Sequence, residues 1–166
     1  GADAEASFRD FKRATLADLH GYRCFCVPET SLSRSQQKSL FSADAIFLGG
    51  GNTFHFLKHL RARRLLGKLR LYAKRGGILS GLSAGSILLT PDITTAVVPS
   101  LDSDENIVGL KNWDSLGLVP FDFSPHYVKS KSVDVELKDY SRKAGRPIFA
   151  CADGSGIVIK NGKMHV

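Results

Sequence analysis

One five-residue segment, Gly81-Leu82-Ser83-Ala84-Gly85, constrains the fold of this chain more than any other. The apolar run 77–80 before it is typical of a short buried strand, and residues 84–89 after it are typical of a helix start. A G-x-S-x-G segment at such a turn holds its serine at a sharp corner, with the hydroxyl exposed and backbone N–H groups beside it. The small neighbours let the backbone turn tightly and let a substrate carbonyl come close. The sequence therefore predicts that Ser83 is a nucleophile.

The length and composition favour one folded domain. A chain of 166 residues can bury a sizeable core, and its hydrophobic and charged fractions, 43% and 23%, are ordinary for a globular protein. No apolar run approaches the roughly 20 residues that cross a bilayer. The first five residues are acidic rather than basic, unlike a signal peptide. We therefore expect a single α/β domain over residues 1–166 and no membrane partner.

The three cysteines indicate a reducing environment. Cys24 and Cys26 lie two residues apart on a predicted strand, which holds them too extended for easy bridging. No C-x-x-C metal pattern is present in the sequence. We expect a cytoplasmic protein.

Much of the net charge of +7 lies between residues 58 and 75. A solvated helix face and a nucleic-acid-binding surface both explain such a stretch. The helix face is favoured, because apolar residues recur through the stretch at near-helical spacing: Leu60, Leu65, Leu66, Leu69 and Tyr72. We expect no nucleic-acid partner, although the positive field could attract a small acidic substrate.

Predicted helices and strands alternate along the chain. Helices are expected over residues 4–19, 33–41, 53–74 and 133–143, the third with a break near Arg63 or Gly67. Strands are expected over residues 22–27, 45–48, 94–98, 116–119, 148–152 and 156–160, and Asn161-Gly162 predicts a closing hairpin. Repeated βα units predict an open, mostly parallel sheet with helices on both faces. Sites in such sheets form beyond the carboxyl ends of the strands.

A serine nucleophile needs a base, which is usually histidine. His126 follows the apolar residues 121–123 and a proline that fixes where its imidazole projects. A buried, hydrogen-bonded structural histidine explains this position equally well. His55 and His59 lie four residues apart on one predicted helix, but no third ligand is evident, so no metal site is expected.

The base needs an acid to orient it, and Asp153 is the best-placed aspartate. It follows the predicted strand 148–152 and precedes a glycine, so its carboxylate is expected at the strand end. A turn aspartate that bonds its own backbone is the alternative. Other aspartates in this half of the chain are less well placed: Asp102, Asp104, Asp114, Asp122, Asp134 and Asp139.

The order Ser83, His126, Asp153 has separations of 43 and 27 residues. It differs from the Ser–acid–His order of the α/β-hydrolases, which argues against that fold. It is compatible with a triad, because geometry and not chain order defines one.

The loop Gly49-Gly50-Gly51-Asn52 follows a predicted strand and precedes a helix. It could cradle a phosphate, although its spacing fits neither the Rossmann nor the Walker pattern. It could instead form an oxyanion hole, and losing one donor of such a site typically costs about 3–4 kcal/mol. The candidate oxyanion and substrate-binding residues are Gly50, Gly51, Asn52 and Ala84.

Three motifs together, residues 49–54, 81–86 and 124–127, resemble the peptidase E (alpha-aspartyl dipeptidase) family of serine peptidases. That resemblance implies a fold like the class I glutamine amidotransferases. It implies that Ser83 is the nucleophile, His126 the base and Asp153 the acid, with N–H groups of Gly51 and Ala84 holding the oxyanion. The expected protein is a peptidase of short peptides, monomeric or homodimeric, without metal or cofactor. The alternative is a non-catalytic member that binds a ligand or partner.

The chain departs from that family in two ways. Family members carry an N-terminal βα portion that is absent from this sequence, so we expect a sheet edge that needs cover. The family also pairs an arginine, shortly after the histidine, with the substrate's aspartate side chain. Residues 128–136 hold Lys129 and Lys131 but no arginine, and lysine cannot form the bidentate contact. The resemblance therefore does not extend to a preference for N-terminal aspartate.

Overall fold

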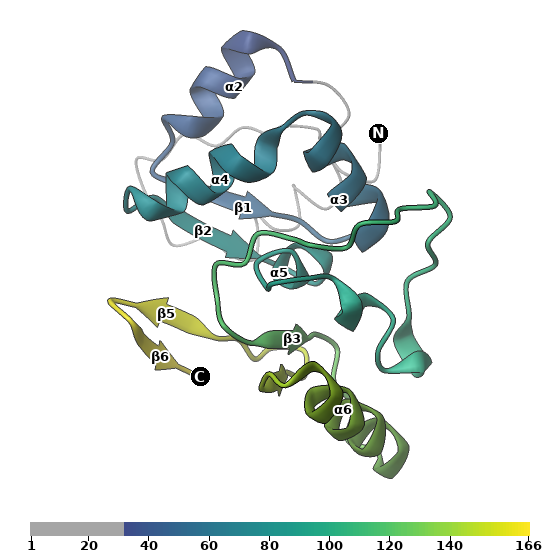
Figure 1. The fold of residues 1–166 in the computed structure, drawn as a ribbon. Helices are drawn as coiled ribbons and strands as arrows, with labels where there is room; N and C mark the ends of the chain where they lie inside the picture. Colours follow the sequence, from purple (N-terminus) through teal and green to yellow (C-terminus); the bar gives the residue numbers. More distant parts are fainter. Residues whose placement is uncertain (1–31) are drawn as a thin grey trace.

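The structure is a computed structural model that describes residues 32–166. The predicted helix 4–19, the predicted strand 22–27, Cys24 and Cys26 lie outside these residues. The described part is an α/β fold in which α5 (Ala84–Ile87) lies between two small parallel strand pairs and contacts both (Figure 1).

The first strand pair comprises β1 (Ala45–Leu48) and β2 (Ile78–Gly81). They run parallel, with Ala45 opposite Ile78 and Leu48 opposite Gly81. Ahead of them, α2 (Arg34–Phe41) begins at a capping box in which Ser33 Oγ accepts the Gln36 N–H and Gln36 Oε1 accepts the Ser33 N–H. The predictions of this helix and both strands are confirmed.

Two helices, α3 (Thr53–Ala62) and α4 (Leu65–Lys74), connect β1 to β2. The predicted helix 53–74 breaks near Arg63, one of its two predicted break positions, where Arg64 adopts a left-handed φ of 55°. Gly67, the other predicted break, lies inside α4. The main hydrophobic core packs beneath these helices and includes Phe54, Leu57, Leu60, Leu69, Leu88, Ile93 and Leu116.

The predicted strands 94–98 and 116–119 are wrong. The first region instead begins with the 3₁₀ turn η1 (Thr94–Ala96), and a second 3₁₀ turn, η2 (Ser100–Asp102), follows it. Asp92 Oδ1 accepts the Thr94 N–H, and this local bond starts a turn in a segment whose β-branched residues otherwise favour a strand. The second region docks on the end of α5, where its N–H groups donate to the carbonyls of Leu88 and Leu89.

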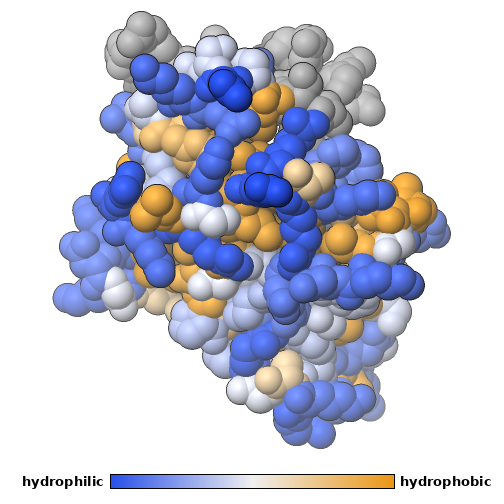
Figure 2. Space-filling view, turned by 45° about the horizontal axis from the view of Figure 1, so that its top comes forward, coloured by the Kyte–Doolittle hydropathy of each residue, from blue (hydrophilic) through white to orange (hydrophobic). Residues whose placement is uncertain are grey.

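The basic residues of α3 and α4 hold the segment 108–116 against these helices. Arg61 donates to Asn112 Oδ1 and to the Asp114 carbonyl, and Arg70 Nε donates to the Leu116 carbonyl at 2.8 Å. Hydrophilic residues interrupted by small apolar patches cover the face shown in Figure 2. Arg61 and Arg70 therefore pack against this segment, which the interpretation of a solvated helix face did not predict.

The second strand pair comprises β3 (Asp122–Ser124) and β4 (Ile148–Ala150), which run parallel and are connected by the crossover helix α6 (Lys131–Ala144). Ser130 caps the start of α6, and Gly145 ends it with a φ of 64°. The chain then forms the antiparallel hairpin β5 (Val158–Lys160) and β6 (Lys163–His165), as Asn161-Gly162 predicts. In the described residues the predicted parallel pairing is thus confirmed, in two separate pairs, one of which uses β3, a strand that the sequence analysis did not predict.

A buried ionic network anchors β3. The carboxylate of Asp122 is fully buried and accepts bonds from Arg146 Nε and Nη2, each at 3.1 Å, and from the Tyr140 hydroxyl at 2.9 Å. Arg146 also pairs with Asp92 at 2.6 Å. The network therefore ties β3 to the start of β4 and to the segment after α5. Within residues 32–166, no helix combines the length and apolar character that a bilayer span requires.

Candidate active site

Ser83 lies at the corner between β2 and α5. The Leu82 N–H donates to the Leu48 carbonyl at 3.0 Å, which extends the strand pairing up to the corner. Ser83 itself has φ 51° and ψ −119°, a conformation that non-glycine residues rarely adopt. Such strain persists where surrounding structure enforces it, and it is characteristic of a nucleophile elbow.

The two glycines of the motif are required by close backbone approach. A Cβ atom on Gly81 would lie well under 3.0 Å from the backbone of Gly85. A Cβ atom on Gly85 would collide in the same way with the carbonyl of Leu48. The G-x-S-x-G spacing therefore lets α5 begin directly against β1 and β2, which forces the sharp corner at Ser83.

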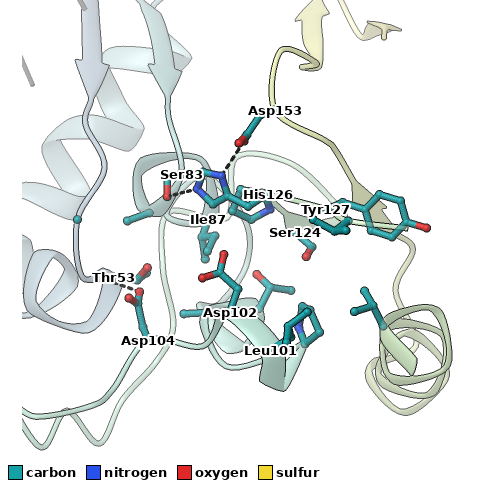
Figure 3. Close-up of a pocket in the computed structure, with 18 residues that line it drawn as sticks. Thr53, Ser83, Ile87, Leu101, Asp102, Asp104, Ser124, His126, Tyr127 and Asp153 are labelled. Carbon is teal, nitrogen blue, oxygen red and sulfur yellow. Dashed lines mark hydrogen bonds and ion pairs between the residues drawn. The ribbon is translucent and has the colours of Figure 1, made fainter. Parts of the chain in front are cut away.

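The structure brings the three predicted side chains together. His126 Nε2 lies 2.9 Å from Ser83 Oγ, and His126 Nδ1 lies 2.7 Å from Asp153 Oδ1 (Figure 3). A carboxylate can only accept, so this pairing favours the tautomer with the proton on Nδ1. The Nε2 lone pair then accepts the Ser83 hydroxyl. This arrangement can pass a proton from serine to imidazole and hold the resulting charge.

Main-chain bonds beyond β3 and β4 carry His126 and Asp153 to the same place. Cys151 N–H donates to the Ser124 carbonyl and Tyr127 N–H donates to the Cys151 carbonyl, both at 3.0 Å. His126 has φ 56° and its side chain is 41% exposed, so the alternative of a buried structural histidine is wrong. Asp153 begins the turn with Gly154, but its carboxylate bonds the imidazole.

The glycine loop lies beside the serine. A Cβ atom built on Gly50 would be 3.5 Å from Ser83 Cβ, and Gly51, with φ 123°, lines the cavity in front of Ser83. Ala84 also lines this cavity. Asn52 is placed differently, because Oδ1 accepts the His55 N–H at 3.0 Å and Nδ2 donates to the Glu105 carbonyl at 2.9 Å. Its side chain therefore caps α3 and holds a loop.

The cavity has a volume of about 460 Å³. Three carboxylates, those of Asp102, Asp104 and Asp153, line it, and no lysine or arginine of the described chain does. Asp104 Oδ2 accepts the Thr53 N–H at 2.8 Å across 51 residues of sequence. Sequence reasoning did not select Asp102 or Asp104, because no local pattern signals a contact over such a separation.

Cys151 is a second residue near this site that carries a potential nucleophile. Its backbone bonds the segment that holds His126, as described above. It is buried, and burial raises the pKa of its thiol. A protonated thiol is a poor nucleophile. Of these two groups, it is the Ser83 hydroxyl that lies within hydrogen-bond distance of the His126 imidazole.

Neither His55 nor His59, the histidine pair on α3, lines the cavity in front of Ser83. The Nε2 atoms of His55 and His59 lie 3.3 Å apart. Over residues 32–166 no group of three or more histidine, cysteine, aspartate or glutamate side chains is arranged to hold a metal ion.

Comparison with known proteins gives the family. The model of peptidase family S51 matches residues 4–166, and the chain belongs to this family. The chain is 31% identical to a Drosophila melanogaster protein named as a probable alpha-aspartyl dipeptidase, over 90% of this chain and 64% of that protein. It is 37% identical to a Citrobacter koseri peptidase E over 55% of this chain and 38% of that one.

The fold has a solved counterpart. A crystal structure described as a peptidase E protein from Listeria monocytogenes EGD-e superposes with a TM-score of 0.68 and 25% identity, covering 84% of this chain and 67% of that one. The chain spans less than two thirds of the length of both the Drosophila and the Citrobacter relative. The resemblance inferred from the three motifs is thus confirmed at the level of family and fold.

Proposed function

We propose that this protein is a cytoplasmic serine peptidase that hydrolyses short peptides through an acyl-enzyme. The single observation that carries the proposal is the continuous chain of hydrogen bonds from Ser83 Oγ through His126 to Asp153. The family membership and the peptidase names of the relatives support the same activity.

In the proposed mechanism, Ser83 Oγ attacks the scissile carbonyl carbon while its proton moves to His126 Nε2. The oxyanion is held by the N–H groups of Gly51 and Ala84, with Gly50 leaving space beside Ser83. Collapse breaks the C–N bond, and the imidazolium returns the proton to the leaving amine. Water then attacks the acyl-enzyme, with His126 as base, and releases the acid and free Ser83.

Asp153 orients His126 and stabilises the imidazolium. Its carboxylate is 82% exposed, so the interaction operates in contact with solvent in the described chain. Asn52 is proposed to act indirectly, because its cap on α3 holds the glycine loop that precedes it. No step of this mechanism needs a metal or an organic cofactor.

The decisive experiment combines labelling by a fluorophosphonate with turnover of a dipeptide panel. We expect one label, on Ser83, and hydrolysis that falls about 10⁴-fold or more in Ser83→Ala. The control is Ser39→Ala, which removes an exposed hydroxyl from α2 and should leave both readouts unchanged. Equal hydrolysis with and without the Ser83 hydroxyl would contradict the mechanism.

The alternative function is a non-catalytic member of the family that binds a small ligand or partner. It predicts no labelling of Ser83 and no turnover of any dipeptide by folded protein. Binding without hydrolysis, measured by calorimetry on the wild-type chain, would favour this alternative.

A further inference from the structure

The cavity next to Ser83 has a charge opposite to that of the whole molecule. The chain carries a net charge of +7, yet the charged groups lining this cavity, among residues 32–166, are Asp102, Asp104 and Asp153, besides the imidazole of His126. An acidic cavity attracts cations and repels anions. Its charge therefore bears on which peptides can place a carbonyl at Ser83.

Two of the three carboxylates are already engaged. Asp153 bonds His126, and Asp104 accepts the Thr53 N–H at the start of α3. The Asp102 carboxylate, by contrast, has no hydrogen bond or ion pair with any residue that the structure describes. Figure 3 shows this carboxylate pointing into the cavity from the side opposite Asp153.

The backbone that carries Asp102 is anchored on both sides. Ser100 donates its N–H and its hydroxyl to Glu136 Oε2 of α6, each at 2.8 Å. Both bonds lower the pKa of Glu136, so it is ionised at neutral pH. On the other side, the Asp104 N–H donates to the Ala96 carbonyl at 2.7 Å. These contacts fix the backbone on both sides of Asp102, whereas its exposed side chain is left without a partner in the described residues.

The cavity also contains polar groups without partners. Thr53 and Thr95 line it and are 0% and 4% exposed. Neither hydroxyl has a hydrogen-bond partner within the described residues. A buried hydroxyl left unsatisfied is costly, and such groups are expected where a polar ligand or water completes the site.

We infer that this cavity selects peptides with an ammonium group next to the scissile bond, and that Asp102 is the residue that binds it. The inference rests on the proposed function. The ammonium can be the free N-terminal amine or a lysine side chain of the residue whose carbonyl Ser83 attacks. An aspartate side chain at that residue meets Asp102 and Asp104 and is disfavoured, because like charges at short range repel.

The test of turnover uses the p-nitroanilides of alanine, N-acetylalanine, lysine, N-acetyllysine and aspartate. We expect kcat/KM for alanine to exceed that for N-acetylalanine by about tenfold or more, with aspartate below alanine. Asp102→Asn should reduce two ratios of kcat/KM, alanine to N-acetylalanine and alanine to aspartate, to less than about threefold. The change should occur mainly in KM. The N-acetyllysine arm separates the two sources, since it retains only the side-chain ammonium.

The matched control is Asp139→Asn, which removes the same charge from α6, where Asp139 pairs with the exposed Arg142. It should preserve every ratio. Both variants should melt within about 2 °C of the wild type, so that a change in the ratios reports on the cavity. Equal turnover of the alanine and aspartate substrates, with ratios unmoved by Asp102→Asn, would overturn the inference.

A binding measurement separates failure of this inference from failure of the proposed function. Ser83→Ala protein cannot turn over its ligand, and calorimetry can compare lysinamide with aspartate α-amide. We expect lysinamide to bind at least about tenfold more tightly, and Asp102→Asn to remove the difference. If the wild type shows no turnover but Ser83→Ala still prefers lysinamide, only the peptidase mechanism is refuted. Turnover without the preference would refute only the role of Asp102.

Discussion

The two halves of the proposed active site are held in different ways. Ser83 is fixed by backbone packing, because Gly81 and Gly85 allow α5 to begin directly against β1 and β2. His126 and Asp153 lie instead at the exposed ends of a strand pair only three residues long. They are placed by a few main-chain bonds and by their bond to each other.

This difference predicts which substitutions change both stability and activity and which change activity alone. A close-packed corner has no space for added atoms, so a change there disturbs the fold and the nucleophile together. An exposed carboxylate contributes little to folding, so a change there disturbs the chemistry alone. The buried network under β3 is the exception in the second half, because it anchors the strand that leads to His126.

The largest effect is expected at the corner itself. Gly85→Ala places a Cβ atom against the Leu48 carbonyl, and backbone on both sides prevents relief. We expect a loss of about 4 kcal/mol or more in the free energy of unfolding, and loss of activity with it. Urea unfolding followed by circular dichroism measures this change.

Gly67→Ala is the matched control for that variant. Gly67 is exposed inside α4, and a Cβ atom there meets nothing within 4 Å. Alanine at this helix position should stabilise by about 0.5–1 kcal/mol. Equal stability of the two variants would break the description of the corner as close-packed.

The second effect is expected on activity alone. Asp153→Asn keeps the shape of the side chain but removes the charge that orients His126 and stabilises its protonated form. We expect kcat/KM to fall by about 10³–10⁴-fold, with the melting temperature unchanged within about 2 °C. Steady-state kinetics and a thermal melt check both parts. A melting temperature that falls together with the activity would contradict the separation of the two halves.

The third effect is on stability through the buried network. Arg146→Ala leaves the fully buried carboxylate of Asp122 without its cation, which we expect to cost about 3 kcal/mol. Arg142→Ala, which removes an exposed ion pair with Asp139, should cost less than about 1 kcal/mol. Denaturant unfolding of both variants measures the contrast, and similar losses would contradict the anchoring role of Arg146.

The smallest expected effect is a loss of stability at alkaline pH. Burial raises the pKa of Tyr140 above its ordinary value of 10.0, and the hydrogen bond to Asp122 raises it further. Above pH 10 the unfolded chain loses this proton while the folded chain keeps it, so stability falls as pH rises. We expect melting temperature to fall less steeply above pH 10 in Tyr140→Phe than in the wild type. Parallel slopes would show that Tyr140 does not carry this dependence.

Local signals in the sequence predicted much of this molecule. Ser33 and Asn161-Gly162 act through bonds and dihedral angles within a few residues, so the helix start and the hairpin could be inferred from them. The strand ends before Ser83 and Asp153 were inferred from apolar runs followed by glycine-containing turns. Because parallel strands end at one edge, the approach of Asp153 to Ser83 could be anticipated. The strand before His126, β3, was not predicted, and His126 was selected because a serine nucleophile needs a base.

Contacts between distant residues could not be predicted in this way. Residues 94–98 favour a strand by composition, but the bond from Thr94 to Asp92 turns the chain instead. Asp104 reaches Thr53, and Arg70 reaches residues 115 and 116, across long stretches of the described chain. These contacts depend on how α3, α4 and η2 pack, and that packing leaves no periodic signal in the sequence.

The central claim is that Ser83, His126 and Asp153 act as one unit, and a double-mutant cycle tests it most directly. The measurement is kcat/KM on one dipeptide substrate for the wild type, Ser83→Ala, Asp153→Asn and the double variant. We predict that the double variant is no slower than Ser83→Ala, because orienting the base gains nothing once the nucleophile is absent. Losses that multiply would contradict the claim, since they would mean that the carboxylate acts independently of the serine.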